Sequence, residues 1–453
     1  MDETALLADA DRRAHAYALE TADAPVFPSP AAIAGLAAFD EVLPTQGKPL
    51  GDSLALLDDA GSRATTRSTG GRYFGFVIGA ALPEAAAAER LMLAWDQCAS
   101  SFDNSPVAAT VEKVAGRWVI DALGLPTDSA VGFGTSATAC TIGCLTAARR
   151  SLLARLGWDF DRDGLAGAPE IRVVVSDLVH ITVKKALRML GFGIGRLLIA
   201  PTDAAGRIDP AQLPPIDDRT ILCLQAGEVN SGAFDPFAAI IPAARAKGAW
   251  VHVDGAFGLW VRAAPSVAGL ADGVELADSW TTDGHKWLNT PYDGAMAICR
   301  DADALAQAMN SDAVYATAAA DAQKNLTLEF SRRARGIPVW AALRSLGRDG
   351  VAAMVERHIA QARQLAARLG DAGFDIVVPP VINQVLVRGR DEAESRAIQA
   401  GVAQSGEAWF GMTVWRGAPA FRLSVSSWRT SDDDIDRLVA ALIAARDAHR
   451  NSR

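Results

Sequence analysis

Short runs of β-branched residues alternate along the chain with stretches that have the spacing of helices. This alternation predicts strands and helices in turn. Short runs of β-branched residues indicate buried strands at 171–175, 221–224 and 250–253. Between the last two strands, an alanine-rich stretch at 237–247 predicts a helix whose end is marked by a glycine. Because strands that alternate with helices form βα units, we expect a mostly parallel sheet from about residue 85 to about residue 340.

The pattern changes after residue 340, where the regular alternation ends. One helix is predicted at 351–369, with short strands near 376–378 and 385–387. Behind Ser431 and three aspartates, apolar residues recur at the spacing of an amphipathic helix: Ile435, Leu438, Val439, Leu442 and Ile443. We therefore predict three parts of the chain: an N-terminal helical arm at 1–68, a large domain at 69–340 and a small α+β domain at 341–453.

Composition narrows the class of protein. With 453 residues, half of them hydrophobic and 21% charged, the chain has the size of a globular enzyme with two or three domains. The net charge of −9 is spread along the chain, which argues against a nucleic-acid or anionic-membrane partner. Five cysteines without a CxxC pair suggest neither disulfides nor a zinc site. With an acidic N-terminus and no apolar run long enough to span a membrane, the protein is expected to be cytoplasmic and metal-free.

Lys286 and Asp254 are the strongest candidates for chemistry. Lys286 lies in the run Asp283-Gly284-His285-Lys286-Trp287, where apolar neighbours favour an uncharged, nucleophilic amine. Asp254 follows the strand at 250–253, so its carboxylate is expected at the strand's carboxyl end, where open α/β sheets bind ligands. A pyridoxal phosphate (PLP) enzyme needs such a pair, because a lysine forms a Schiff base with the cofactor aldehyde and an aspartate keeps the pyridine nitrogen protonated. A surface lysine and a salt-bridged core aspartate are the alternatives.

A segment of small and hydroxylated residues at 132–139 supplies a candidate phosphate site. It precedes a helix predicted to run to about residue 150. The backbone N–H groups around Ser136, Ala137 and Thr138 would be free to bind an anion, which the helix dipole favours. An ordinary capped helix would explain the same residues without any ligand.

Three further segments carry polar residues near the predicted strand ends. His180 follows the strand at 171–175 and could lie flat on a cofactor ring, although a lone histidine is more often structural. Asn230, in the segment 227–235, could border the same pocket or belong only to a turn. The run Arg332-Arg333-Ala334-Arg335 could bind an anion, but solvated arginines are more common in such runs.

Together, these motifs resemble the group II PLP-dependent decarboxylases, the family of the aromatic L-amino acid and glutamate decarboxylases. The pair His252-Val253-Asp254 and His285-Lys286-Trp287 is specific, and the resemblance covers nearly the whole chain. The other motifs occur in the family's order: Ser105-Pro106 with Glu112, Gly134 to Arg149, His180, 227–235, Ser331-Arg332-Arg333 and Phe421 to Val425. The resemblance implies the PLP-dependent transferase type I fold, that of aspartate aminotransferase. This is an α/β fold in which a large domain with a mostly parallel mixed sheet is followed by a smaller C-terminal α+β domain.

The resemblance also implies a role for each candidate residue. Lys286 would carry the Schiff base, Asp254 would hold the pyridine nitrogen, and His180 would stack on the ring as a base-like residue. Other cofactor contacts would come from Ser136, Ala137, Thr138, Asn230, Ala256, Asp283 and His285, and substrate contacts from Tyr73, Phe74, Phe76 and Val77. The implied reaction is decarboxylation of an L-amino acid, aromatic or apolar, to the amine and CO2. The active site would lie between the subunits of a homodimer.

Two departures from the family pattern keep other reactions open. At the position of Asp283 the family often has an uncharged asparagine, and a carboxylate would repel a phosphate unless a proton or cation intervened. In many members a mobile loop of the other subunit brings a tyrosine that protonates the carbanion, whereas the stretch 316–330 has none and Tyr315 lies just upstream. The alternatives are an aldehyde synthase, an aldolase or other lyase, an aminotransferase, and a PLP-binding homologue without turnover.

Overall fold

The computed structural model describes residues 2–310 and 322–452 and divides into two compact units. The smaller unit comprises the residues up to Ala80, Gln361–Val377 and the residues from Val385 onward. The larger unit comprises Ala81–Ala360 and Val378–Gln384. Both divisions differ from the expected boundaries after residues 68 and 340, so the three-part division of the chain stays a prediction.

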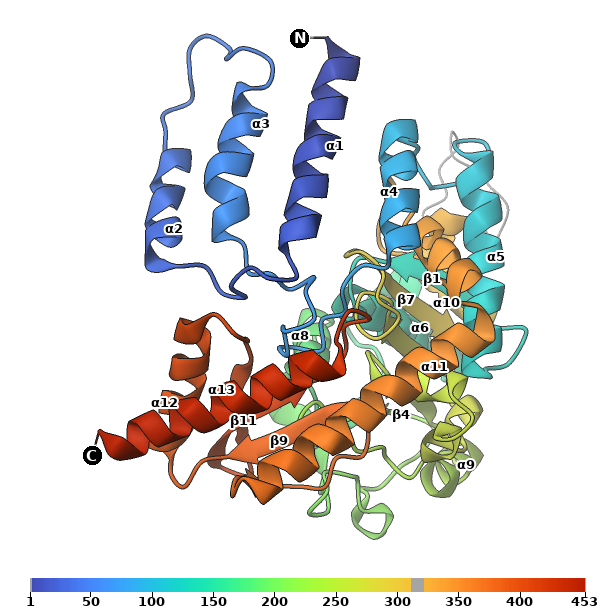
Figure 1. Ribbon diagram of the computed structural model, residues 1–453. Helices are drawn as coiled ribbons and strands as arrows, with labels where there is room; N and C mark the ends of the chain where they lie inside the picture. Colours follow the sequence, from blue (N-terminus) through green and yellow to red (C-terminus); the bar gives the residue numbers. More distant parts are fainter. Residues whose placement is uncertain (1, 311–321, 453) are drawn as a thin grey trace. The chain divides into compact units, whose positions relative to one another are not determined.

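A seven-stranded sheet in the order β1-β7-β6-β5-β4-β2-β3 forms the centre of the larger unit (Figure 1). Neighbouring strands from β6 to β3 are parallel, whereas β7 runs antiparallel to both β1 and β6. Every residue of β4, β5, β6 and β7 is buried, as expected for strands covered on both faces. The strands are β1 (Ala130–Gly134), β2 (Arg172–Ser176), β3 (Leu198–Ala200), β4 (Thr220–Gln225), β5 (Trp250–Asp254), β6 (Ser279–Asp283) and β7 (Ala295–Cys299). The three predicted strands are thus confirmed as β2, β4 and β5.

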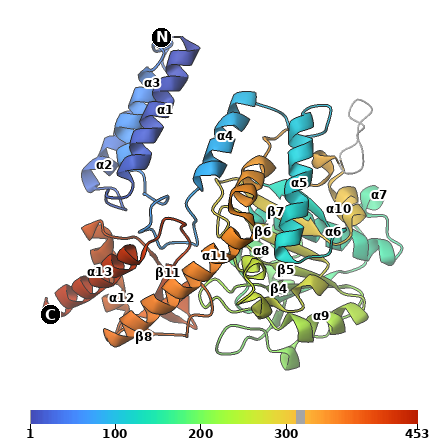
Figure 2. The same cartoon turned by 45° about the vertical axis from the view of Figure 1, so that its right-hand side comes forward.

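Helices surround this sheet (Figure 2). They are α4 (Pro83–Trp95), α5 (Pro106–Leu123), α6 (Ala137–Arg155), α7 (Phe160–Asp163), α8 (Ile181–Met189), α9 (Phe237–Ala246), α10 (Ala302–Met309) and α11 (Gly336–Asp371). The predicted helices at 237–247 and 351–369 correspond to α9 and to the second part of α11. The helix α11 begins before the predicted start, and Gly347, with a φ of 62° and a ψ of −176°, separates its two parts. Only glycine adopts this backbone conformation readily.

The smaller unit has a separate hydrophobic core. Its first three helices, α1 (Glu3–Glu20), α2 (Pro30–Gly35) and α3 (Asp52–Leu56), lie side by side (Figure 1). A four-stranded sheet has the order β10-β11-β9-β8. Its strands are β8 (Asp375–Ile376), β9 (Gln384–Arg388), β10 (Gly411–Trp415) and β11 (Ala418–Ser424), and its helices are α12 (Glu392–Ser405) and α13 (Asp432–Asn451). The predicted last helix is α13, which begins with a capping box between Ser431 and Asp434 and buries Ile435, Leu438, Val439 and Leu442.

Two residues of the arginine run at 332–335 are not exposed to solvent, contrary to the expectation from the sequence. Arg332 is 7% exposed and donates two hydrogen bonds to the carboxylate of Glu112, at 2.8 and 2.7 Å. Arg335 is also buried. The expectation of solvated arginines is therefore wrong for these two residues, because Glu112 on α5 provides a buried carboxylate that pairs with Arg332.

Candidate active site

The candidate cofactor residues collect at one edge of the large sheet. Because β7 is antiparallel to both β1 and β6, β1 and β6 run in the same direction as β5, β4 and β2. The carboxyl ends of these five strands therefore meet at the same edge. Gly134 and Asp283, the last residues of β1 and β6, both pair with Ala295 of β7. This edge is where open α/β sheets bind their ligands.

Lys286 lies on a tight loop between β6 and β7. The Gly284 N–H donates to the Gly294 carbonyl, and the Thr290 N–H donates to the Gly284 carbonyl at 3.0 Å. A Cβ atom at Gly284 would lie 2.8 Å from Thr290 Oγ1, so a side chain there would force the loop apart. Trp287 is fully buried and donates from Nε1 to His358 Nδ1 at 3.0 Å. The loop is thus held at both ends, and the Lys286 amine lies directly beyond the end of β6.

Asp283 connects this lysine to the start of α6. Its Oδ1 accepts a hydrogen bond from the Ala137 N–H at 2.8 Å, and its Oδ2 lies 3.2 Å from Lys286 Nζ. His285 Nε2 lies 3.8 Å from the same Oδ2 atom. Asp283 is 2% exposed. Four of the predicted cofactor residues, Ala137, Asp283, His285 and Lys286, are therefore brought together around one buried carboxylate.

The start of α6 has the geometry expected for a site that binds an anion. Ser136 is the N-cap residue, and its hydroxyl accepts from the Ala139 N–H at 3.3 Å. Thr138 lies in the first turn and is partly exposed. Cys140 is buried, as expected for a core residue, and burial raises the pKa of its thiol.

His285 is held against an aromatic ring that the sequence did not single out. Its imidazole stacks on Tyr292, with ring centroids 4.5 Å apart. Burial lowers the pKa of His285, and nearby Asp283 raises it by a smaller amount. Among the residues that the structure describes, the Nδ1 atom of His285 is buried and has no hydrogen-bond partner. No pattern in the sequence marks Tyr292, because its role depends on how the loop folds back.

Asp254 lies at the end of β5, next to the strand that carries Asp283. Its Oδ1 accepts from the Ala256 N–H at 3.1 Å, and the Ala256 carbonyl accepts from the Asp283 N–H at 2.8 Å. Asp254 pairs with Thr281, two residues before Asp283, so both carboxylates project from the same face of the sheet. Ala256 is half-buried, which fits a small residue beside a ring.

His180 and Asn230 share this edge of the sheet but make their described contacts locally. His180 is the N-cap residue of α8, and its Nδ1 lies 2.7 Å from Thr182 Oγ1. Asn230 donates from its N–H and its Nδ2 to the carboxylate of Glu228, at 2.8 and 3.1 Å. Glu228, which is 1% exposed, organises the turn after β4 and was not among the predicted site residues. The only signal for it was its place directly after a buried strand.

The predicted substrate residues belong to the smaller unit. Tyr73 stacks on Trp409, with ring centroids 5.1 Å apart, and Phe76 lies 5.3 Å from the same indole. Phe76 is 56% exposed, whereas Phe74 and Val77 are buried. Phe76 and Val77 both have positive φ angles, 54° and 57°, which are uncommon for residues of this kind. Trp409 was not predicted, since only folding brings it to Tyr73.

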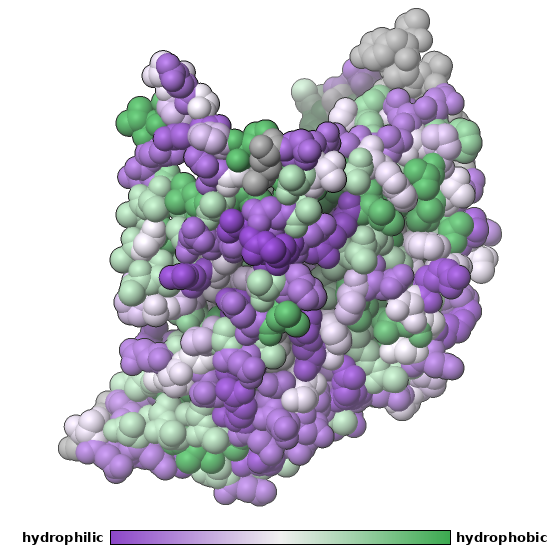
Figure 3. All heavy atoms as spheres, turned by 45° about the horizontal axis from the view of Figure 1, so that its top comes forward, coloured by the Kyte–Doolittle hydropathy of each residue, from purple (hydrophilic) through white to green (hydrophobic). Residues whose placement is uncertain are grey.

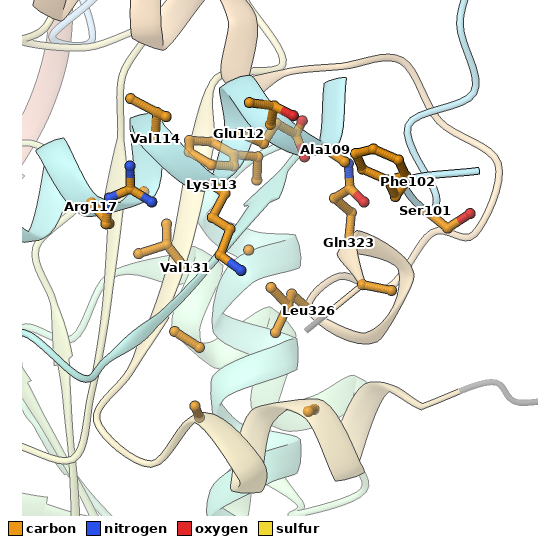
Figure 4. A pocket seen from close by; sticks show the side chains of 18 of the residues that line it. Ser101, Phe102, Ala109, Glu112, Lys113, Val114, Arg117, Val131, Gln323 and Leu326 are labelled. Carbon is orange, nitrogen blue, oxygen red and sulfur yellow. The ribbon is translucent and has the colours of Figure 1, made fainter. Parts of the chain in front are cut away.

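A cavity of about 850 Å³ opens elsewhere in the larger unit. It is lined by residues of α5, β1 and α10 and by residues near Leu326 (Figure 4). Lys113 and Arg117 reach toward it from α5, and Val131 and Leu326 supply apolar walls (Figure 4). Its lining includes Arg332 and the start of the segment 132–139, Gly132 and Phe133, but neither Lys286 nor Asp254 nor any other residue to which the resemblance gives a cofactor or substrate contact. The cavity is therefore distinct from the cofactor site argued above.

The residues at the sheet edge fit PLP. Lys286 offers an amine for the aldehyde, and Asp254 offers a carboxylate for the pyridine nitrogen. The start of α6, with Ser136 and Thr138, offers N–H and hydroxyl donors for a phosphate. The unpartnered Nδ1 of His285 is one more buried polar atom that such a ligand could satisfy. Within residues 2–310 and 322–452, no group of three or more metal-ligating side chains is found, and no helix is long and apolar enough to cross a membrane.

His252, two residues before Asp254 on β5, is expected to make the fold sensitive to acid. Burial lowers the pKa of this imidazole from 6.5 to about 3, so the folded chain holds it neutral. Its stabilising contribution is complete above about pH 6.5 and is lost as the pH falls toward 3, by up to about 1.4 kcal/mol per pH unit. Denaturant titrations from pH 8 to pH 4 should show this loss.

The variant His252→Asn tests the assignment. Asparagine keeps an acceptor near the position of Nδ1, which lies 3.0 Å from Ser279 Oγ, but it cannot titrate. We expect the free energy of unfolding of this variant to depend less steeply on pH than that of the wild type. His15→Asn, on an exposed position of α1, is the matched control and should retain the wild-type slope. Identical slopes for wild type and His252→Asn would contradict the assignment.

Comparisons with known proteins identify the family and the fold. A family model, the pyridoxal-dependent decarboxylase conserved domain, matches residues 73–388. Tryptophan decarboxylase 1 of Oryza sativa subsp. japonica is 28% identical over 426 residues, covering 85% of this chain and 82% of that protein. Phenylacetaldehyde synthase of Arabidopsis thaliana is 26% identical over 367 residues, covering 74% and 73% of the two chains.

Solved structures show the same fold. The crystal structure of Oryza sativa TDC with PLP and tryptamine has a TM-score of 0.89 and 24% identity, covering 98% of both chains. Mouse CSAD in its apo form has a TM-score of 0.88 and 21% identity, also covering 98% of both chains. The predicted type I fold is thereby confirmed. Since the family model spans more than half of the chain, the protein belongs to the pyridoxal-dependent decarboxylases, which are PLP-dependent carboxy-lyases.

Proposed function

We propose that this protein decarboxylates an L-amino acid with an aromatic or apolar side chain, releasing the amine and CO2. The observation that carries the proposal is the cluster around Asp283, which joins the Lys286 amine to the N-terminus of α6. This arrangement supports Lys286 as the residue that bonds covalently to the cofactor aldehyde. When bound, the cofactor supplies an electron sink for the pair left behind as CO2 departs.

The other residues at the edge of the sheet would hold and orient the cofactor. Asp254 would accept a hydrogen bond from the protonated pyridine nitrogen, which keeps the positive charge on the ring. Ser136, Ala137, Thr138 and His285 would bind the phosphate, and Ala256 would leave room for the ring. His180 would hold the ring and move protons near the substrate, and Asn230 would border the pocket after β4.

The aromatic cluster of the smaller unit supports the substrate class. Tyr73, Phe76 and Trp409 form a stack in which Phe76 keeps more than half of its surface exposed. An exposed aromatic ring backed by a rigid indole offers a flat apolar surface for a substrate side chain. In this proposal Phe76 would contact the substrate, and the buried residues Tyr73, Phe74 and Val77 would hold it in place.

A homodimer with the active site between subunits is also proposed. Large apolar side chains are exposed on and after α4, including Leu91, Leu93, Trp95 and Phe102, and apolar atoms reach the surface in several places (Figure 3). Exposed apolar surface of this kind marks sites where proteins associate. The cytoplasmic location expected from the cysteines, the acidic N-terminus and the lengths of the apolar runs stays a prediction.

Turnover of an amino-acid panel by the holoenzyme tests the proposed reaction. We expect CO2 and the matching amine from an aromatic or apolar L-amino acid, in equal amounts, with much less product from acidic and basic amino acids. CO2, amine, aldehyde, peroxide and keto acid should be measured in the same reactions. A keto acid formed without CO2 would reject decarboxylation.

Aldehyde synthesis is the second candidate, and one feature of the chain favours it. The stretch 316–330 contains no tyrosine, and one relative is named phenylacetaldehyde synthase. Residues 316–321 of this stretch, and Tyr315, lie outside the described residues. CO2 accompanied by aldehyde and peroxide in place of amine would establish this candidate over the first.

A further inference from the structure

The carboxylate of Asp283 uses donors that an anionic ligand would need. Both of its oxygens are engaged: Oδ1 with the first N–H of α6 at 2.8 Å, and Oδ2 with the Lys286 ammonium at 3.2 Å. Its side chain is 3% exposed, so water is nearly excluded from these contacts. The N-terminus of a helix attracts negative charge, and here an aspartate of the chain itself supplies that charge.

A second observation is a buried polar atom beside this carboxylate that lacks a partner. The imidazole of His285 faces the same carboxylate, with Nε2 3.8 Å from Oδ2, and the residue is more than nine-tenths buried. Its Nδ1 has no partner among the described residues. A buried imidazole with an unused nitrogen is costly unless a ligand satisfies it.

We propose that Asp283 acts as an internal anion that occupies the phosphate position of the cofactor-free protein and that the cofactor must displace. This inference rests on the proposed function, in which the start of α6 binds the cofactor phosphate. The Asp283 carboxylate and a phosphate cannot both accept from the Ala137 N–H without strong repulsion in a buried site. Entry of the phosphate therefore requires the carboxylate to leave its donors. Asp283 thus weakens cofactor binding through the phosphate group alone.

Binding of PLP and of pyridoxal, which lacks the phosphate, separates this effect from others. We expect Asp283→Asn to bind PLP at least about tenfold more tightly than the wild type, because a neutral amide holds the Ala137 N–H more weakly than a carboxylate does and does not repel the phosphate. Its affinity for pyridoxal should change by less than about threefold. Cofactor-free protein would be titrated with each compound, following Trp fluorescence and the Schiff-base absorbance at about 400–430 nm.

The matched control is Asp121→Asn. Asp121 lies on α5, is about half exposed and forms an ion pair with Arg348, so the substitution removes a carboxylate with an arginine partner outside the site. We expect wild-type affinities for PLP and pyridoxal. Inorganic phosphate is a further probe: at millimolar concentrations it should raise the unfolding temperature of Asp283→Asn by about 2 °C or more while leaving the wild type and Asp121→Asn unchanged.

Three outcomes would overturn the inference. Weaker PLP binding by Asp283→Asn would make Asp283 a ligand of the phosphate and not its competitor. Equal gains for PLP and pyridoxal would mean that the aspartate acts on the lysine amine. Phosphate stabilisation of the wild type equal to that of the variant would mean that the position is open. If Asp283→Asn does not fold, Asp283→Ser serves as a second neutral variant.

Failure of the proposed function would look different from failure of this inference. If Lys286 is not the anchoring lysine, borohydride reduction of the PLP-loaded protein labels another residue in the wild type and in both variants. If only the role of Asp283 is wrong, the affinities for PLP and pyridoxal differ from those expected, and the borohydride label is still found on Lys286.

Discussion

Replacing Lys286 with alanine is expected to lower turnover by at least about 10³-fold. The amine lies beyond the end of β6, 3.2 Å from Asp283, on a loop that Gly284 and Gly294 hold closed. The loss should appear in kcat, because the variant can still bind the cofactor through the start of α6 but lacks the covalent anchor.

The measurement combines rates with labelling. CO2 release from the best substrate of the panel gives kcat, and borohydride trapping followed by peptide mapping locates the covalent bond. Lys185→Ala, on an exposed position of α8, is the control and should keep wild-type rates and wild-type labelling. A label found on a lysine other than 286 in the wild type would refute the assignment of both the anchor and the site.

The second large effect concerns stability. Glu112→Ala should lower the free energy of unfolding by about 3–5 kcal/mol, because it leaves the Arg332 guanidinium buried without its counter-ion. The side chains of Glu112 and Arg332 are only 3% and 1% exposed, and the carboxylate also accepts from the Gly336 N–H at 3.1 Å. Urea titrations of the holoprotein, followed by tryptophan fluorescence and by circular dichroism, would measure the loss.

A double variant separates loss of the pair from loss of the buried charge. Glu112→Leu combined with Arg332→Met replaces both ions by apolar side chains of similar size and should recover much of the stability. The exposed pair between Arg396 and Glu392 on α12 is the matched control, and Glu392→Ala should cost less than about 1 kcal/mol. A Glu112→Ala variant as stable as the wild type would show that Arg332 finds another partner or water.

This ion pair explains why two distant motifs belong together. Glu112 follows Ser105-Pro106 on α5, and Arg332 lies in Ser331-Arg332-Arg333 just before α11. In the linear sequence the arginine run resembled a solvated surface segment, since nothing near it supplies a buried acid. Their pairing across 220 positions depends on the packing of α5 beside the start of α11.

Local patterns were sufficient for three of the seven strands of the large sheet and for the candidate residues of the site. The β-branched runs defined β2, β4 and β5, because fully buried strands must be apolar along their whole length. The small residues before α6 predicted an anion site, because capping and free N–H groups are local properties of a helix start. Asp254 was recognisable because it closes a buried strand, and Lys286 because of its apolar context in the run 283–287.

Tertiary structure alone decided which of these groups touch. The antiparallel strand β7 sits between β1 and β6, and this order brings Ala137 to Asp283 across 146 positions. The contact gives Asp283 its place at the helix end, and Trp409 reaches Tyr73 in the same non-local way. Periodicity reports whether a residue is buried and on which face, whereas strand order and helix packing determine its partner. The sequence therefore determined the elements and the kind of chemistry, and the fold determined that Asp283 binds the donors of the proposed phosphate site.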